Sequence, residues 1–256
     1  GKLKRLRREK QLAGILSFWC MEAALVGRFF AKRYGLPHFC WLCGQDARKT
    51  NRYIKLVRPQ AHELVAISDF VAAEFYRNHK VQPKYVIPNA IDEKMFPPDL
   101  MLQRDIDILG VGALIPLKQF DQLIGIAGRL CQRFPGIRVK ICGIGEEKEN
   151  LEALIRQLGL QNNVELIGAL QHEAVLQLMN RTRLLLHPSA YEGFSTVCLE
   201  AIYSGARVIS FVQPMHQQIK NWYIANSTAE MFDMALEILQ SPFYAERVST
   251  WSIDEI

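Results

Sequence analysis

The hydrophobic pattern of this chain is a regular alternation of short apolar runs with longer segments of helical periodicity. The apolar runs predict strands near residues 14–19, 37–43, 63–68, 84–88, 106–111, 138–142, 163–167, 184–187 and 207–211. Such alternation is typical of repeated βα units, in which parallel strands form a sheet and helices cover its faces. The pattern therefore predicts an α/β protein with parallel sheets.

The predicted strands fall into two groups. Residues 91–104 are polar and contain Pro97 and Pro98, which favours a linker at this point. We therefore expect a first domain at residues 1–95, with about four strands, and a second at residues 96–256, with five. Five parallel strands are enough for a complete small sheet.

Composition and length agree with two modest cores. The chain has 256 residues, of which 49% are hydrophobic, so it can bury one large core or two smaller ones. No apolar run in the sequence is long enough to cross a bilayer, and residues 1–13 are too charged for a secretory signal. These features predict a soluble or peripheral protein of the cytoplasm.

Charge is distributed unevenly. Residues 1–95 contain 18 Lys plus Arg against 8 Asp plus Glu, whereas residues 96–256 contain 13 against 18. The excess begins in GKLKRLRREK, which is typical of a solvated helix face. The alternative is attraction to anionic lipid headgroups, where each nearby Lys or Arg contributes about 1 kcal/mol. No motif indicates a nucleic acid partner.

Six cysteines raise the question of a metal site or a disulfide. Cys40 and Cys43 have the two-residue spacing of many metal sites. However, the segment PHFCWLCG reads as a strand, which would direct residues three apart to opposite faces. No second pair or histidine cluster completes a tetrahedral set. We therefore expect reduced, mostly buried thiols and no metal.

The most informative chemistry lies in HPSAYEGFSTVCLEAIYSG, residues 187–205. Ser195 and Thr196 predict the start of a helix that follows a buried strand, and Gly205 predicts its end. The helix start favours an anion such as a diphosphate. Glu192 would lie in the loop before it, and Glu200 could reach a ribose hydroxyl. The alternative is a capped surface helix with two solvated glutamates.

The segment PSAYEGFSTVCLEAIYSGARVIS resembles the donor-site signature of glycosyltransferase family 4. IDILGVGALIPLKQFDQLI and VKICGIGEEKENLEALIRQLGLQNNVELIGAL resemble further blocks of that family, in the family's order, and the likeness covers nearly all of residues 14–212. The resemblance implies two Rossmann-like domains facing a cleft, the glycosyltransferase B-type fold. The first domain would serve the acceptor, and the second would bind the donor.

The resemblance also implies roles for particular residues. Glu192 would lie beside the sugar and Lys118 would contact the donor phosphates, so both are candidate catalytic residues, while Glu200 would bind the ribose. The remaining donor-binding candidates lie in strand-to-helix turns and are Gly112, Gly143, Gly145, Leu170, Phe194, Ser195, Thr196 and Val197. Without the resemblance, the glycine turns would be ordinary strand-to-helix connections.

Three positions depart from the family pattern. Ala113 stands where an arginine is usual, and Cys43 replaces the histidine near the transferred sugar, although Asp46 keeps the family's aspartate. After Phe211 the chain reads VQPMHQQIKNW in place of two glycines and a glutamate. Because a thiol cannot reproduce the two-sided hydrogen bonding of imidazole, either the sugar contact differs or activity is reduced.

Comparison with the family pattern indicates that both ends of the chain are incomplete. The first domain lacks the family's early strand with its glycine-rich turn, the chain starts without methionine, and WSIDEI resembles only the opening of the family's last helix. We therefore expect a fragment of a longer enzyme.

The resulting hypothesis is a retaining glycosyltransferase without metal or other cofactor. It would move a sugar from a nucleotide diphosphate sugar to a hydroxyl of a glycan or lipid-linked acceptor, in polysaccharide or glycolipid synthesis for a cell envelope. Its expected location is the cytoplasm or the inner face of the membrane. The alternatives are an inactive nucleotide-sugar-binding homologue and a nucleotide-sugar epimerase.

Overall fold

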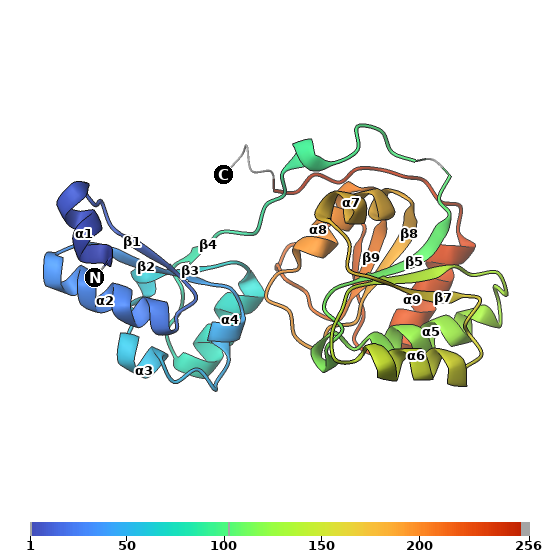
Figure 1. Cartoon of the computed structure of the whole chain (residues 1–256), viewed down its shortest axis with the longest axis horizontal. Helices are drawn as coiled ribbons and strands as arrows, with labels where there is room; N and C mark the ends of the chain where they lie inside the picture. The colour runs from blue at the N-terminus through green and yellow to red at the C-terminus, as the bar shows by residue number, and fades with distance from the viewer. Residues whose placement is uncertain (1, 102, 252–256) are drawn as a thin grey trace. The chain divides into compact units, whose positions relative to one another are not determined.

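A computed structural model describes residues 2–101 and 103–251 of the chain (Figure 1). The chain divides into two compact units, Gly1–Asn89 with Pro214–His216, and Ala90–Gln213 with Gln217–Ile256. The sequence prediction placed the division at residues 95 and 96. The segment WSIDEI, predicted to open a last helix, lies outside the described residues except for Trp251.

The first unit is a parallel sheet with helices. Its strands have the order β1-β2-β3-β4 and are all parallel. They are β1 (Ile15–Phe18), β2 (His38–Leu42), β3 (Leu64–Ala66) and β4 (Tyr85–Val86). The helices are α1 (Lys2–Glu9), α2 (Glu22–Tyr34), α3 (Ile54–Val57) and α4 (Asp69–His79), with 3-10 turns at Gln45–Ala47 and Ala61–Glu63.

Local sequence explains these elements. Ser68 begins α4 by accepting a hydrogen bond from the Val71 backbone N–H, and Gly35 ends α2 in the left-handed conformation, as capping preferences predict. Leu42 of β2, Leu64 of β3 and Phe75 of α4 are each fully buried. The unit therefore has a core of its own.

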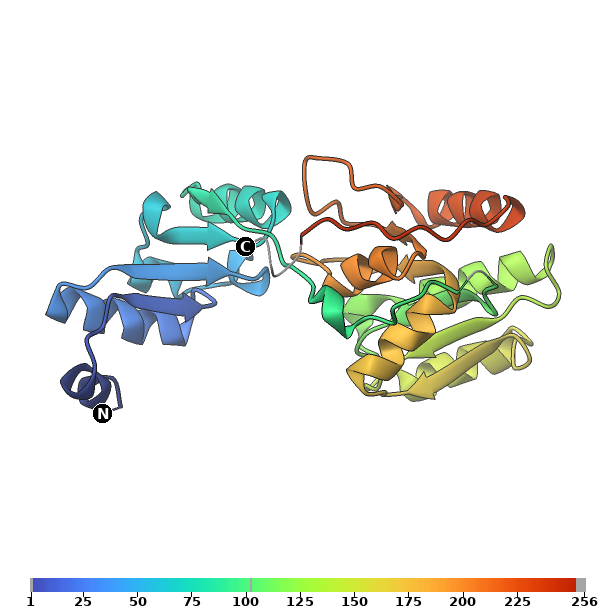
Figure 2. The same ribbon diagram turned by 90° about the horizontal axis from the view of Figure 1, so that it is seen from above.

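The basic segment at the start of the chain forms the separate helix α1. None of its residues is buried, and in Figure 2 it lies at the margin of the first unit. This exposure fits both alternatives drawn from the sequence, a solvated helix face and a face that attracts anionic lipid.

The second unit contains a six-stranded parallel sheet. Its strands are β5 (Ile106–Val111), β6 (Val139–Cys142), β7 (Val164–Gly168), β8 (Thr182–His187), β9 (Arg207–Ser210) and β10 (Trp222–Ile224). The sequence predicted five strands here, and that number was wrong because it omitted β10. Only three residues long and preceded by a polar segment, β10 is recognisable mainly through its pairing with β9.

Helices cover both faces of this sheet. Figure 1 shows α7 and α8 on one face and α5, α6 and α9 on the other. Their bounds are α5 (Phe120–Cys131), α6 (Lys148–Gln157), α7 (His172–Asn180), α8 (Thr196–Tyr203) and α9 (Thr228–Gln240), with 3-10 turns at Glu93–Met95 and Pro116–Lys118. Apolar faces of α5 and α9 pack on β8, where Leu184 and Leu186 are fully buried.

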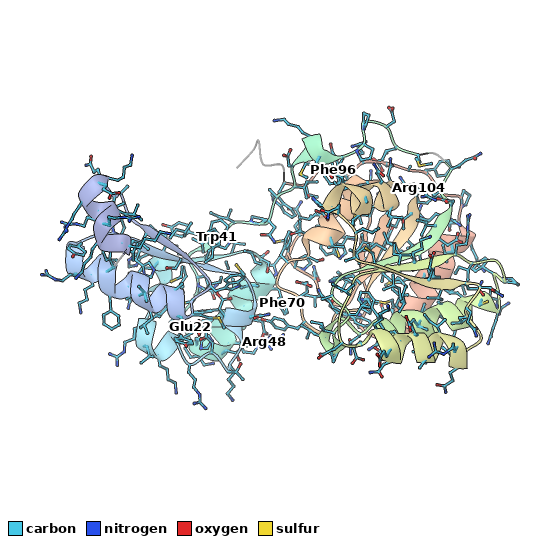
Figure 3. All side chains as sticks on the ribbon, viewed as in Figure 1. Glu22, Trp41, Arg48, Phe70, Phe96 and Arg104 are labelled. Atoms are coloured by element: carbon cyan, nitrogen blue, oxygen red, sulfur yellow. The ribbon has the colours of Figure 1, made fainter. Side chains whose placement is uncertain are left out.

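Part of the predicted linker is held firmly against the second unit. The Arg104 guanidinium donates to the carbonyl oxygens of Met179, Thr182 and Ser204 at 3.1, 2.6 and 2.7 Å, and its side chain is labelled in Figure 3. These bonds satisfy carbonyl groups at the ends of α7 and α8. The segment before β5 is thus an integral part of the unit.

The strand order determines where a ligand would bind. The sheet runs β10-β9-β8-β5-β6-β7, so its order reverses between β5 and β8. In open α/β sheets, ligands bind beyond the carboxyl ends of the strands at such a reversal. The loops that follow β5 and β8 are therefore the first place to look for a site.

Candidate active site

The loops after β5 and β8 bring the two predicted catalytic residues together. The Ala190 backbone N–H donates to the Leu117 carbonyl at 3.0 Å, which joins the two loops. Beside this bond, Lys118 Nζ lies 2.6 Å from Glu192 Oε2, and both side chains are about four-fifths buried, with 20% and 23% exposure. Residues 74 positions apart thus form an ion pair at the reversal of the sheet.

A histidine completes this cluster. His187 Nε2 lies 3.2 Å from Glu192 Oε2 and 3.2 Å from Ser189 Oγ, and the residue is 4% exposed. His187 is thus a packed histidine that is hydrogen-bonded within its own loop. The ring supports the loop that holds Glu192.

The charges of the cluster follow from its surroundings. Burial by itself would raise the pKa of Glu192, but the hydrogen bond from His187 and the charge of Lys118 outweigh it and hold the pKa at about 2. Burial lowers the pKa of His187 below its ordinary value. Near neutral pH, Glu192 is therefore an anion and His187 an uncharged donor, so the Lys118 cation is matched by one carboxylate.

The helix start predicted beside Glu192 is present. Ser195 caps α8, and its hydroxyl accepts from the Cys198 backbone N–H at 3.4 Å. Thr196 and Val197 form the first turn and are half-buried. This end of the helix carries the partial positive charge of the helix dipole, beside the Lys118 and Glu192 pair.

Phe194 is placed differently from the other candidates at this turn. Its ring is 4% exposed and packs against Trp222 and Trp251, with centroid distances of 6.2 and 5.6 Å. The aromatic side chain therefore belongs to the core. A contact between Phe194 and a ligand would have to use its backbone.

The second glutamate is also partnered. Glu200 Oε1 lies 2.7 Å from His172 Nε2, and Glu200 is 8% exposed. Burial raises the pKa of Glu200, and the hydrogen bond with His172 acts in the opposite direction. Sequence reasoning missed His172, because it lies 28 residues from Glu200 and is brought to it only by the packing of α7 on α8.

The glycine turns after β5 and β6 pack against each other. A Cβ atom on Gly143 would lie 1.8 Å from the Gly112 carbonyl oxygen, and one on Gly145 would lie 2.2 Å from the Leu114 carbonyl oxygen. These glycines are thus required by the contact between two loops. The ligand contact predicted for them stays a prediction.

Gly112 and Leu170 lie at the same edge of the sheet. At Gly112 (φ 154°), a Cβ atom would be 3.5 Å from Lys118 Cε, so the lysine stem passes close to this glycine. Leu170 follows β7 and is 41% exposed, and Ile144 after β6 is 63% exposed. The carboxyl ends of these strands therefore present apolar surface near the Lys118–Glu192 ion pair.

The departures from the family pattern can be placed in the two units. Ala113 is exposed beside Gly112. In the first unit, Cys43 Sγ donates to the Trp41 carbonyl at 3.7 Å, and burial raises the pKa of Cys43 to about 11. The thiol is thus uncharged near neutral pH and cannot act as a cationic donor.

Asp46 organises the loop that contains Cys43. Its carboxylate accepts hydrogen bonds from the backbone N–H groups of Cys20, Cys43 and Gly44, each at 3.0 Å. Asp46 is fully buried. Asp46 therefore fixes the turn that carries Cys43.

The cysteines form no disulfide. Cys20, Cys40, Cys142 and Cys198 are buried, whereas Cys43 and Cys131 are partly exposed, and all six are free. Within residues 2–101 and 103–251, no group of three or more His, Cys, Asp or Glu side chains has the arrangement of a metal site. In the same residues, no helix is long and apolar enough to span a bilayer.

Solved structures resemble this arrangement. The chain superposes on sucrose-phosphate synthase from Thermosynechococcus elongatus with a TM-score of 0.75 and 17% identity, covering 94% of this chain and 67% of that one. It matches HepE of Anabaena in complex with UDP with a TM-score of 0.73 and 20% identity, covering 93% and 71%. These likenesses confirm the predicted glycosyltransferase B-type fold.

Curated relatives are more similar in sequence. The chain is 31% identical over 203 residues to the phosphatidylinositol N-acetylglucosaminyltransferase gpi3 subunit of Schizosaccharomyces pombe, which covers 77% of this chain and 44% of that protein. It is 31% identical over 124 residues to the GPI3 subunit of the same transferase from Saccharomyces cerevisiae, covering 45% and 27%. The chain thus spans less than half the length of these relatives.

The family comparison covers the site described above. The family described as "Glycosyl transferases group 1" matches residues 92–234, a span that contains Lys118, Glu192 and Glu200. This is more than half of the chain, so the chain belongs to the glycosyl transferases group 1 family.

Proposed function

We propose that the protein is a retaining glycosyltransferase of family 4 that uses a nucleotide diphosphate sugar as donor. The observation that carries this proposal is the 2.6 Å pair between Lys118 and Glu192, placed where the strand order reverses and next to the start of α8. A cation, a carboxylate and a helix N-terminus around one point suit a diphosphate joined to a sugar.

In this proposal the residues act mainly through electrostatics. Lys118 has three donor hydrogens, so it can keep its bond to Glu192 and also contact the leaving diphosphate. The positive end of α8 adds to this stabilisation of the departing charge. Glu192 orients the donor near its sugar. Because the protein supplies the positive charge itself, we propose that no metal or other cofactor is needed.

The nucleoside would lie on the side of the Lys118–Glu192 pair that faces away from the sugar. Glu200 would accept hydrogen bonds from the ribose hydroxyls, and the exposed Leu170 would lie beside the base. The turns of Gly112, Gly143 and Gly145 would border the nucleotide. Together with the Ser195–Val197 turn, these residues would form the donor half of the site.

The acceptor is proposed to be a hydroxyl on a glycan or lipid-linked acceptor, in glycolipid or polysaccharide synthesis for a cell envelope. Relatives named for phosphatidylinositol support a lipid acceptor. The excess of basic residues in the first 95 positions, 18 against 8 acidic, supports peripheral contact with an anionic membrane from the cytoplasmic side.

A second candidate is a homologue that binds the nucleotide sugar without transferring it. The uncharged thiol of Cys43 and the missing cation at Ala113 favour it. The residues 212–222, which replace the family's two glycines and glutamate, favour it as well. Such a homologue would still bind the nucleotide diphosphate but would lack the contacts that hold the sugar for transfer.

One experiment separates these functions. The full-length protein is incubated with a panel of nucleotide diphosphate sugars and with lipid and glycan acceptors, with and without EDTA, and the anomeric configuration of the product is read by NMR. We expect transfer with retention, unaffected by EDTA. Binding without turnover would identify the inactive homologue, and a donor converted to its epimer would identify an epimerase.

His172 provides a separate prediction about the ribose. Replacing His172 with alanine is expected to weaken nucleoside diphosphate binding about 3- to 10-fold, because Glu200 loses the hydrogen bond that holds its carboxylate. Calorimetry with the ribonucleotide and its 2′-deoxy form would measure this, and the variant should discriminate less between the two.

Two further variants make the result specific. His172→Gln keeps a donor and should restore much of the discrimination. Glu173→Ala changes an exposed residue in the same first turn of α7 and should leave it unchanged. Equal discrimination by wild type and His172→Ala would remove the role assigned to His172.

A further inference from the structure

The first unit contains a basic hollow that the donor site does not explain. Two adjoining cavities of about 490 and 390 Å³ lie along α3 and the end of α4, and they share Lys55, Asn78 and His79 as lining residues. Each volume is in the range of about 300–1,000 Å³ that is usual for small-molecule sites. We call these two cavities the basic hollow.

The lining of the basic hollow is strongly cationic. Lys49 and Arg52 line the first cavity, Arg58 and Lys80 line the second, and Lys55 lines both. The sequence contains no acidic residue between Asp46 and Glu63. Across the described part of the chain, none of the five cations forms an ion pair.

The acidic residues closest in sequence and structure are already engaged. Glu22 is hydrogen-bonded to the Tyr53 hydroxyl, Glu74 pairs with Arg77 at 2.5 Å, and Asp46 accepts three backbone N–H groups. Figure 3 labels Glu22 together with Arg48, where the basic run begins. Among the described residues, none of these carboxylates forms an ion pair with a cation of the hollow, which therefore keeps an excess of positive charge.

The end of α4 forms one wall of the hollow. His79 lines both cavities, and its Nε2 is buried with no hydrogen-bond partner among the described residues. Beside it, the Asn78 side-chain amide donates to the Ala47 carbonyl at 3.0 Å, which fixes this wall. His79 and Asn78 therefore form a fixed wall of the hollow.

We propose that the basic hollow binds a phosphate-bearing ligand with more than one negative charge. Ammonium and guanidinium groups are the side chains that match phosphate oxygens, and five of them here lack a counter-ion. The lining contains no exposed aromatic ring on which a nucleic acid base could stack. The inference concerns the first unit alone and does not depend on the donor site.

The phosphate could come from a phospholipid headgroup or from a soluble phosphate ester. Vesicles of phosphatidylcholine with a minority of phosphatidic acid test the first source by co-sedimentation. Glycerol 3-phosphate tests the second by calorimetry. Both are used at low salt with the full-length protein, because screening weakens exposed charges.

Variants locate the binding. Lys49→Ala with Lys55→Ala is expected to weaken binding about fivefold per removed cation. The matched control is Lys84→Ala, an exposed lysine of the same unit outside both cavities. A second control, Lys4→Ala with Arg8→Ala, removes two cations from α1. Thermal melting establishes that each variant is folded, since all these side chains lie on the surface.

The outcomes divide clearly. If only the vesicles bind, and the Lys49 and Lys55 variant loses that binding, the hollow binds a lipid phosphate. If glycerol 3-phosphate binds and the same variant loses that binding, the hollow binds a soluble phosphate ester. The proposal is overturned if neither probe binds, or if the α1 variant loses binding while the Lys49 and Lys55 variant retains it. Failure of the donor panel would leave this result unaffected.

Discussion

Replacing Lys118 with alanine is expected to lower kcat for sugar transfer by about 10²- to 10³-fold. Removing a single group that stabilises developing negative charge in an active site typically has an effect of this size. Lys118 is also the cation that pairs with Glu192 at 2.6 Å, so its loss leaves a largely buried carboxylate beside His187. Initial rates with the preferred donor would measure the change.

A second ion pair of the same unit provides the control. Lys140 Nζ lies 2.7 Å from Glu165 Oε2, but Glu165 is 63% exposed and the pair joins β6 to β7 away from the reversal of the sheet. Exposed pairs contribute about 0–1 kcal/mol to stability, so Lys140→Ala should leave kcat unchanged. Comparable activity of the Lys118 and Lys140 variants would refute the assigned role of Lys118.

Replacing Gly143 with alanine is expected to destabilise the protein by about 3 kcal/mol or more. The added Cβ atom would lie 1.8 Å from the Gly112 carbonyl oxygen, and the residue has φ 155°. Because the obstacle is backbone, it cannot move aside as a flexible side chain would, and both overpacking and strained dihedrals are costly. Denaturant unfolding would measure the loss.

The control for this substitution is a glycine in open space. Gly125 lies inside α5, and no atom of another segment lies within 4 Å of the position that a Cβ atom would take there. Alanine favours a helix interior by about 0.5–1 kcal/mol over glycine, so Gly125→Ala should stabilise slightly. A Gly143→Ala protein as stable as wild type would show that the two loops need not pack this closely.

The two predictions concern the same feature of the molecule. The loop after β5 carries Lys118, and it is held against the loop after β6 by the close approach of Gly112 to Gly143. A catalytic group must be held by a rigid surrounding to be effective. A glycine with no direct role in chemistry can therefore support the position of the cation.

The two units differ in how far they keep the family pattern. In the second unit, Lys118, Glu192 and the Ser195 cap of α8 lie together, as the proposed diphosphate contact requires. In the first unit, Cys43, which stands where the resemblance expects a histidine near the sugar, is an uncharged thiol with a pKa of about 11. This contrast is the physical basis for testing binding and turnover separately.

The periodicity of apolar residues was sufficient to predict the βα units. Each of the nine predicted strands is present, because buried strands such as Leu184–Leu186 need continuous apolar sequence in any parallel sheet. Capping chemistry similarly predicted the start of α8 at Ser195. These features depend on neighbours along the chain, so local sequence is enough to specify them.

Contacts between distant segments became visible only in the folded chain. Pairing with β9 defines β10, the packing of α7 on α8 brings His172 to Glu200, and the strand order places Lys118 against Glu192 across 74 positions. The packing of Gly143 on Gly112 likewise required the folded backbone. Such contacts depend on which strands become neighbours, and local sequence preferences carry little information about that choice.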